Sequence, residues 1–163
     1  MTHDPRPELA MSTAQAPAPT IRNPGTKPAT SRKLFVNIPV TNLQRSIDFF
    51  EALGFTFNAQ FTDATATAML VGEDAYFMLL TRERFADFTK RAIGDPRRDT
   101  QALYALGVDS REAVDAMVTK AIELGGTHAM EPQDHGFMYG WSFYDLDGHH
   151  FEVFWMDPSV PQG

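Results

Sequence analysis

The sequence predicts an α+β fold in which two βαβββ modules form a concave sheet with the helices on the outside. The order strand, helix and three strands occurs twice between residues 33 and 158, and the repetition of a whole element order is the strongest indication of this fold. The helix ends Leu53-Gly54-Phe55 and Leu124-Gly125-Gly126 occupy equivalent places in the two repeats. One module of about sixty residues would bury too little apolar surface to be stable alone, so we expect the two to pack as one body with a cleft between their free faces.

The chain divides by composition into a tail and one domain. With 163 residues it has the length of roughly one domain. Residues 1–32 are predicted to be a disordered tail, because six prolines alternate there with Ala, Thr and Ser and little can be buried. We expect module 1 at residues 33–82, a linker at 83–100, module 2 at 101–158 and a short C-terminal tail at 159–163.

Module 1 opens with a β-branched run at residues 34–40, which predicts a strand. Asn42 is a suitable N-cap for an amphipathic helix at residues 43–53, and Gly54 stands where a left-handed C-cap is expected. Three further strands are predicted at residues 55–61, 65–71 and 75–81. A short helix is expected in the linker, at residues 84–90.

Module 2 repeats this order. A strand at residues 103–108 precedes a helix that Ser110 caps and Gly125-Gly126 ends. Three strands are predicted at residues 127–130, 139–144 and 149–155. Asp147-Gly148 is expected to supply the positive φ values of the tight turn between the last two strands.

Charge and composition exclude several classes of function. The formal net charge of −7 disfavours a nucleic-acid partner or an anionic membrane, because both would repel the chain. The chain has no cysteine, so disulfides, thiolate nucleophiles and zinc-thiolate sites are impossible. No apolar run approaches the roughly 18 to 20 residues that span a bilayer. These features favour a cytoplasmic protein.

Two strings carry a resemblance to a known family. FVNIPVTNLQRSIDFFEALGF (residues 35–55) resembles the opening module, and FYDLDGHHFEV (residues 143–153) the last hairpin, of the vicinal oxygen chelate superfamily of glyoxalases, bleomycin-resistance proteins and extradiol dioxygenases. The resemblance covers residues 33–157. Residues 132–141 and 154–157 further resemble a bacterial subgroup labelled predicted lactoylglutathione lyases.

The resemblance also implies where a divalent metal would be held. Glyoxalases take one ligand from each of four strands, and the corresponding positions here are Phe35, Leu79, Leu103 and Glu152. Only Glu152 can coordinate a cation, whereas zinc, nickel and iron sites need four to six ligands. We therefore expect no metal cofactor; the alternative is a divalent metal such as Ni, Zn or Fe on other ligands.

Strand alternation indicates which residues are candidates for catalysis and ligand binding. His150 and Glu152 share one strand face and form a candidate acid/base pair; alternatively both are exposed at the hairpin end. Asn37 shares a face with Phe35 and is expected to orient a ligand, or else to satisfy nearby backbone groups. The remaining cleft-lining side chains are expected to be mainly apolar: Phe77, Leu79, Thr81, Leu103 and Ala105.

Residues 131–141 have the most unusual local composition, with aromatic residues and Met between glycines. They suit a flap closing on a ligand or a contact surface for a second subunit; alternatively, the aromatic side chains only cover the core. The candidate ligand-binding residues in this segment are His135, Phe137, Tyr139 and Trp141.

Two functions follow from these features. The first is a protein that binds a small, partly apolar or aromatic molecule in a cleft lacking most metal ligands, and the acidic pI of about 5.1 suits a cationic ligand. The second is a metal-dependent lyase or isomerase of the lactoylglutathione lyase type, with Glu152 as base or ligand. The resemblance implies a homodimer in either case.

Overall fold

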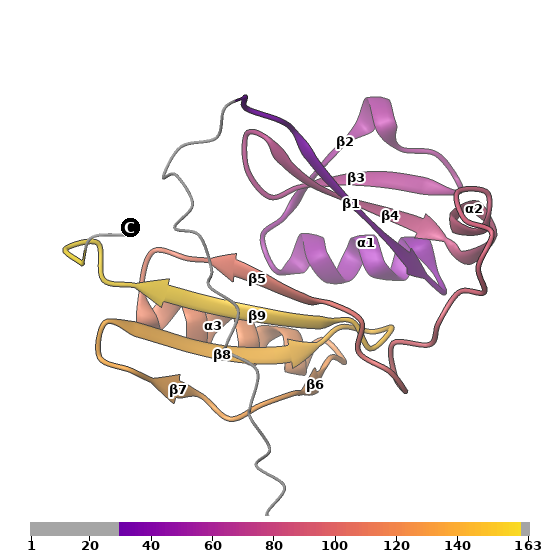
Figure 1. Cartoon of the computed structure of the whole chain (residues 1–163). Helices are drawn as coiled ribbons and strands as arrows, with labels where there is room; N and C mark the ends of the chain where they lie inside the picture. Colours follow the sequence, from indigo (N-terminus) through magenta and orange to yellow (C-terminus); the bar gives the residue numbers. More distant parts are fainter. Residues whose placement is uncertain (1–29, 161–163) are drawn as a thin grey trace, which may run out of the picture. The chain divides into compact units, whose positions relative to one another are not determined.

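The computed structural model describes residues 30–160, and it contains one four-stranded and one five-stranded sheet (Figure 1). Most of the predicted N-terminal tail and the last three residues lie outside the described residues. The first sheet has the order β1-β4-β3-β2, with β1 and β4 parallel and the other pairs antiparallel. Its elements are β1 (Leu34–Val40), α1 (Leu43–Ala52), β2 (Thr56–Asn58), the 3₁₀ turn η1 (Ala59–Phe61), β3 (Ala66–Leu70) and β4 (Ala75–Thr81).

The second sheet repeats the first. Its order is β5-β9-β8-β6, β5 and β9 are parallel, and the additional strand β7 pairs with β8. The elements are β5 (Leu103–Gly107), α3 (Arg111–Glu123), β6 (Thr127–His128), β7 (Gln133–Asp134), β8 (Met138–Tyr144) and β9 (His150–Met156), after the linker helix α2 (Arg82–Ala86). The α+β class and the internal repeat are therefore confirmed. No helix within residues 30–160 has the length and apolar character needed to cross a bilayer.

The predicted helix caps are confirmed. The Asn42 side chain accepts a hydrogen bond from the Arg45 amide (3.0 Å), and the Ser110 hydroxyl accepts one from the Ala113 amide (3.0 Å). Each satisfies one of the amides that a helix start leaves without a partner. Gly54, just beyond α1, has a φ of 97°.

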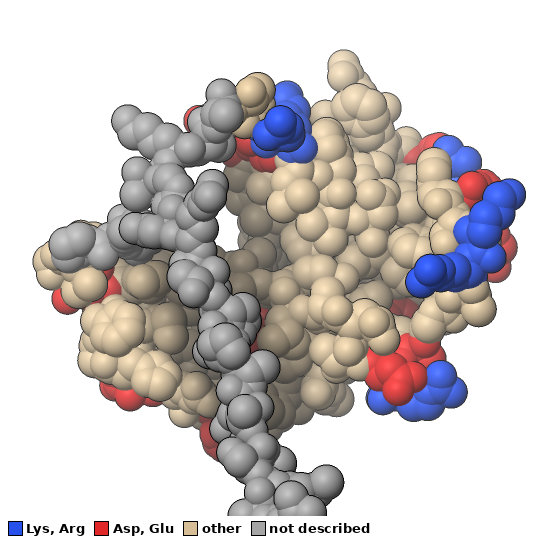
Figure 2. Space-filling model, in the orientation of Figure 1, with Lys and Arg blue, Asp and Glu red and all other residues tan. Residues whose placement is uncertain are grey.

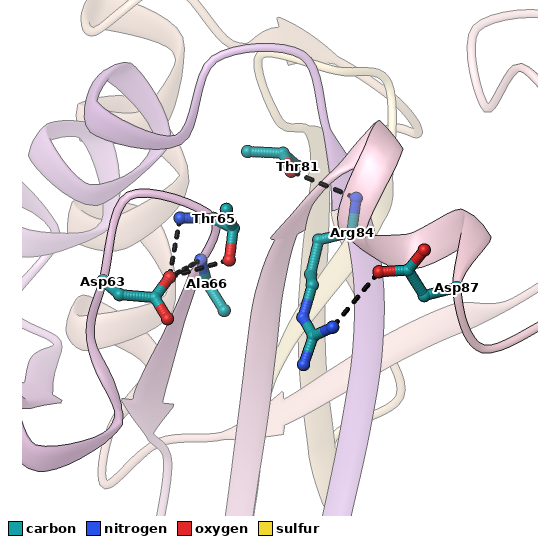
Figure 3. Close-up of polar contacts among 6 residues, drawn as sticks. All are labelled: Asp63, Thr65, Ala66, Thr81, Arg84 and Asp87. Atoms are coloured by element: carbon teal, nitrogen blue, oxygen red, sulfur yellow. Dashed lines mark hydrogen bonds and ion pairs between the residues drawn. The ribbon is translucent and has the colours of Figure 1, made fainter.

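Local side-chain contacts shift three predicted boundaries. The strand expected at residues 55–61 ends at Asn58, because the Asn58 side chain accepts from the Gln60 amide (2.9 Å) and starts a 3₁₀ turn. The linker helix begins at Arg82 rather than Arg84, because the Thr81 hydroxyl accepts from the Arg84 amide (3.2 Å) and caps it (Figure 3). The strand expected at residues 127–130 ends at His128.

Aromatic side chains from both modules share one core. The Phe50 ring of α1 lies 5.3 Å from that of Phe151 in β9, and the Phe77 ring of β4 lies 5.1 Å from that of Tyr104 in β5. Phe50 and Phe151 are fully buried. Fully buried aromatic rings contribute a large share of core stability. Because these rings lie on the helix-facing sides of the two sheets, the modules meet through those sides. Within residues 30–160, the contact between the modules is thus made by the core-facing sides of the sheets and not by their free faces, which we expected to face each other.

The turn between β8 and β9 fastens module 2 to module 1. The Asp147 carboxylate accepts hydrogen bonds from the Thr41 amide (2.9 Å) and the Thr41 hydroxyl, just before α1, and lies 3.5 Å from the Ser46 hydroxyl. His149 Nε2 lies 2.8 Å from the Pro39 carbonyl oxygen. We call the contacts of Asp145, Asp147 and His149 the turn junction.

Asp145 and Gly148 shape this turn from inside. The Asp145 carboxylate accepts from the amides of Asp147 and His149 (both 2.9 Å). Gly148 has a φ of 94°, and a Cβ there would lie 2.9 Å from the Arg97 amide nitrogen of the linker. Asp147 does not adopt the positive φ that we expected, since only glycines do so among residues 30–160. The turn therefore requires glycine at position 148 both for φ and for space.

Replacing Asp147 by alanine is expected to lower the free energy of unfolding by about 3 kcal/mol, because the two donors of Thr41 and the buried Ser46 hydroxyl lose a charged acceptor. Urea denaturation followed by circular dichroism measures the loss. The matched control is Asp157→Ala, which removes a carboxylate bonded only to the nearby Ser159 and is expected to cost below about 1 kcal/mol. Equal losses in the two variants would contradict the role of the turn junction.

Asp145 is expected to make stability depend on pH. Burial raises the pKa of Asp145 from 3.8 to about 6. The folded state therefore holds this proton more tightly than the unfolded chain, so the contribution of Asp145 to stability is full below about pH 4 and is lost as the pH rises through about 6. Asp145→Asn keeps an acceptor without a charge, and its stability relative to the wild type should rise by up to about 3 kcal/mol between pH 4 and pH 7.

Thermal denaturation across that pH range tests this expectation. The Asp48→Asn variant is the control, because it makes the same substitution at an exposed position. A pH-independent difference for Asp145→Asn would show that burial does not shift this carboxyl group.

Candidate functional site

A cavity with a volume of about 600 Å³ lies on the free face of the second sheet. We call it the sheet cavity. All of its lining residues belong to module 2, in β5, β8, β9 and the segment before β8. They are Leu103, Ala105, Met130, Glu131, Gln133, Met138, Gly140, Trp141, Ser142, His150, Glu152, Val153, Phe154 and Met156.

Alternation along β9 builds this face. His150, Glu152 and Phe154 line the cavity, whereas Phe151 between them is fully buried in the core. Leu103 and Ala105 come from the neighbouring β5, where Ala105 pairs with Glu152. The sequence prediction that these side chains share one face is therefore confirmed.

Three polar groups of the cavity wall lack partners. Within residues 30–160, no side chain or backbone group forms a hydrogen bond or ion pair with the Glu152 carboxylate. Trp141 Nε1 and His150 Nε2 are the two buried side-chain nitrogens without a hydrogen-bond partner in the described part of the chain. Unpaired buried polar atoms are costly, so the arrangement favours a ligand or water that brings the missing partners.

The charge of the cavity has one sign. Its wall contains the carboxylates of Glu131 and Glu152 and no Lys or Arg. Figure 2 shows that the Lys and Arg side chains on this face of the molecule gather at its margins, away from the broad surface that carries neither charge. An anionic ligand would therefore find no counter-ion here, whereas a cation would be attracted to Glu152.

The segment at residues 130–138 forms one side of the cavity, and Arg111 of α3 holds it. The Arg111 guanidinium forms an ion pair with Asp134 (2.7 Å), donates to the Gly136 carbonyl (2.7 Å), and lies over the rings of Tyr139 (5.2 Å) and Trp155 (5.0 Å). Its hydrogen bonds lower the pKa of Asp134 to about 2. Sequence analysis missed Arg111, because nothing in a local pattern links residues 23 positions apart.

The four ligand-binding residues predicted in the segment 131–141 do not all lie at the sheet cavity. Of the four that we predicted, only Trp141 lines the sheet cavity, and it also packs against the core. His135 and Phe137 are exposed. Tyr139 lies toward α3, where its hydroxyl donates to Asp115 (2.7 Å), and this hydrogen bond raises its pKa to about 12.

The residues predicted in module 1 do not join the sheet cavity. Phe35 is half exposed and stacks on Tyr76, with ring centroids 4.8 Å apart. Asn37 lines a second, smaller cavity beside the linker. Phe77 and Leu79 lie in the hydrophobic core, so the expectation that they line a cleft is wrong. The register explains the error: β4 pairs Met78 with Asn37, which puts Met78 on the free face and turns its neighbours toward the helix.

The same register corrects the set of metal-ligand positions. Asn37 and Met78 pair in module 1 as Ala105 and Glu152 pair in module 2, so the counterpart of Glu152 is Met78 rather than Leu79. The positions become Phe35, Met78, Leu103 and Glu152, with one carboxylate and one weakly coordinating thioether among them. Within residues 30–160, no group of three or more His, Asp or Glu side chains could hold a metal ion. These residues do not fit a zinc, nickel or iron centre.

Solved structures share this fold. A hypothetical protein, SA1046, from S. aureus is 29% identical, with 77% of this chain and 94% of that chain covered and a TM-score of 0.66. The fosfomycin resistance protein FosX from Listeria monocytogenes is 17% identical (77% and 93% covered, TM-score 0.56). TnmS3, an antibiotic binding protein from Streptomyces sp. CB03234, is 19% identical (80% and 99% covered, TM-score 0.56). The last two show the likeness of the fold alone.

No curated protein matches the chain. The model of one protein family matches residues 34–153, which include both modules and the linker. This chain therefore belongs to the Glyoxalase/Bleomycin resistance protein/Dioxygenase superfamily.

Proposed function

We propose that the protein binds a small, partly aromatic cation in the sheet cavity without a resident metal. The observation that carries the proposal is a cavity of about 600 Å³ with mainly apolar walls, an unpaired Glu152 carboxylate and no Lys or Arg. This volume lies within the roughly 300 to 1,000 Å³ of sites for drug-sized molecules.

The wall residues account for the expected ligand. Trp141 and Phe154 offer aromatic surface to a flat ring or a cation. Met130, Met138 and Met156 are flexible and polarizable, so they can adapt to ligands of different outline. Glu152 then supplies the charged contact that fixes orientation, and Ser142, paired with it across the strands, stands beside it.

One similar structure supports a binding role: TnmS3 is described as an antibiotic binding protein. A protein that sequesters a toxic small molecule needs a cavity and selective contacts, and it needs no catalytic metal. We infer an antibiotic-like ligand for this chain on the same scaffold.

The second candidate is a lyase or isomerase of the lactoylglutathione lyase type, the subgroup that the sequence resembles. One observation favours it: His150 and Glu152 line the same cavity, as an acid/base pair would require. In this role Glu152 would remove a proton from a bound substrate. We rank it second because Phe35, Met78 and Leu103 supply no oxygen or nitrogen ligand for the metal of that reaction.

We include a homodimer in the proposal. Phe35 and Leu103 are each about half exposed on the free faces of their sheets, at 50% and 53%. A second copy would cover such apolar surface. A cytoplasmic location stays a prediction from the sequence.

Binding of a flat aromatic cation such as acriflavine, measured by fluorescence titration, tests the first candidate. Ala105 is exposed on the cavity wall, so Ala105→Trp should fill the cavity and weaken binding by at least about tenfold, and Glu152→Gln should weaken it by about five- to tenfold. The matched control is Ala116→Trp, which adds the same side chain at an exposed position of α3. Equal affinities in the wild type and both cavity variants would refute the assignment.

Metal analysis decides between the two candidates. After incubation with Ni²⁺, Zn²⁺, Mn²⁺ or Fe²⁺ and removal of free ions, elemental analysis is expected to find far less than one ion per chain, because one carboxylate cannot hold a divalent cation alone. The same samples should not turn over the methylglyoxal–glutathione adduct. Stoichiometric metal, together with turnover that Glu152→Gln abolishes, would establish the lyase instead.

A further inference from the structure

A second cavity of about 260 Å³ lies where β1, the start of β5 and the start of β9 meet the linker. We call it the linker cavity. It is separate from the sheet cavity, and His150 is the one residue that lines both. The other lining residues are Asn37, Pro39, Phe85, Thr89, Ala92, Ile93, Gly94, Pro96, Asp99, Thr100, Gln101, Ala102, Tyr104, Gly148 and His149.

Asn37 and Tyr104 each bring to this wall a polar group that is available for a ligand. The Asn37 amide nitrogen donates to the Phe35 carbonyl (3.3 Å), which leaves the Asn37 side-chain oxygen without a donor among residues 30–160. The Tyr104 hydroxyl likewise has no hydrogen-bond partner in that part of the chain, and burial raises its pKa, so it stays a neutral donor. His149 Nε2 already lies 2.8 Å from the Pro39 carbonyl.

The charges of the wall exclude an anion. No Lys or Arg lines the linker cavity, and its one carboxylate, Asp99, already forms an ion pair with Arg98 (2.7 Å). An anionic ligand would lose its hydration without gaining a counter-ion. A neutral ligand incurs no such cost.

The wall formed by Phe85, Ile93 and Pro96 is apolar and suits a flat ring. Phe85, Ile93 and Pro96 come from α2 and the linker. The Thr81 cap and the Arg84–Asp87 ion pair, both drawn in Figure 3, hold the helix turn that presents Phe85. The volume is below that of sites for drug-sized molecules, so we expect a ligand of about ten non-hydrogen atoms.

We propose that the linker cavity is a second binding site, for a neutral aromatic ring that carries a carboxamide. The Tyr104 hydroxyl donates to the carbonyl oxygen of the amide, and the Asn37 side-chain oxygen accepts from its N–H. Phe85, Ile93 and Pro96 enclose the ring. This site is independent of the function proposed for the sheet cavity, because only His150 is common to both.

Nicotinamide and its anion nicotinate form a matched pair of probes. Two-dimensional amide NMR spectra of the full chain, titrated to about 20 mM because a ligand of this size binds weakly, should show shifts at Ala92, Gly94 and Gln101 with nicotinamide. Nicotinate should bind at least about tenfold more weakly, because it brings a charge to a wall without a cation. Shifts confined to the sheet cavity, around Met138 and Phe154, or none at all, would overturn the proposal.

Four variants locate the site. Ala102→Trp should fill the linker cavity and abolish the shifts, while Ala116→Trp and Ala105→Trp should leave them unchanged. Tyr104→Phe keeps the ring contacts with Phe77 and Phe151 and removes only the hydroxyl, and it should weaken nicotinamide binding about fivefold. Unchanged binding in both Ala102→Trp and Tyr104→Phe would also overturn the proposal. Acriflavine binding to the sheet cavity should persist in Ala102→Trp, so failure of one site is distinguishable from failure of the other.

Discussion

The arrangement of the two modules depends on the hydrogen bonds that the buried Asp147 carboxylate accepts at the amino end of α1. This carboxylate joins the turn before β9 to Thr41 and Ser46, while His149 joins the same turn to Pro39. Asp145 holds the turn in shape by accepting two of its amides. The start of β9 is thereby fixed against module 1, and β9 in turn carries His150 and Glu152. A few charged and amide groups thus fix the turn whose Gly148 and His149 line the linker cavity.

Because its side chains alternate, β9 contributes both to the core and to the wall of the sheet cavity. Phe151 and Val153 are fully buried in the common core, and the residues between them face the sheet cavity. Gly148 lets the linker approach the turn closely enough to close the linker cavity from the other side. Neither cavity wall contains Lys or Arg, although the chain has 14 such residues. This distribution selects against anionic ligands at both sites.

The chain keeps the scaffold of its superfamily while the positions of the metal ligands are apolar. Phe35, Met78 and Leu103 provide no oxygen or nitrogen donor, so Glu152 is left as a free carboxylate in an apolar wall. The Glu152 carboxylate among aromatic and methionine side chains is better suited to hold an organic cation than to complete a metal centre. The site chemistry therefore supports binding, which the fold alone could not decide.

Local sequence patterns were sufficient to predict the repeat, the helix caps at Asn42 and Ser110, and the shared face of His150 and Glu152. Each of these features depends on the spacing of residues along a single element. The side of β4 that faces the helix was not decided by the sequence, because the Tyr76 hydroxyl is the one polar side-chain group between Ala75 and Leu80 and a single group sets the phase of the alternation only weakly. Pairing with β1 put Leu79 inside and Met78 outside. Residues far apart in the chain likewise form the two-residue strand β7, the ion pair between Arg111 and Asp134, and both cavities. Contacts of this kind are set by how the elements pack, and no local pattern records them.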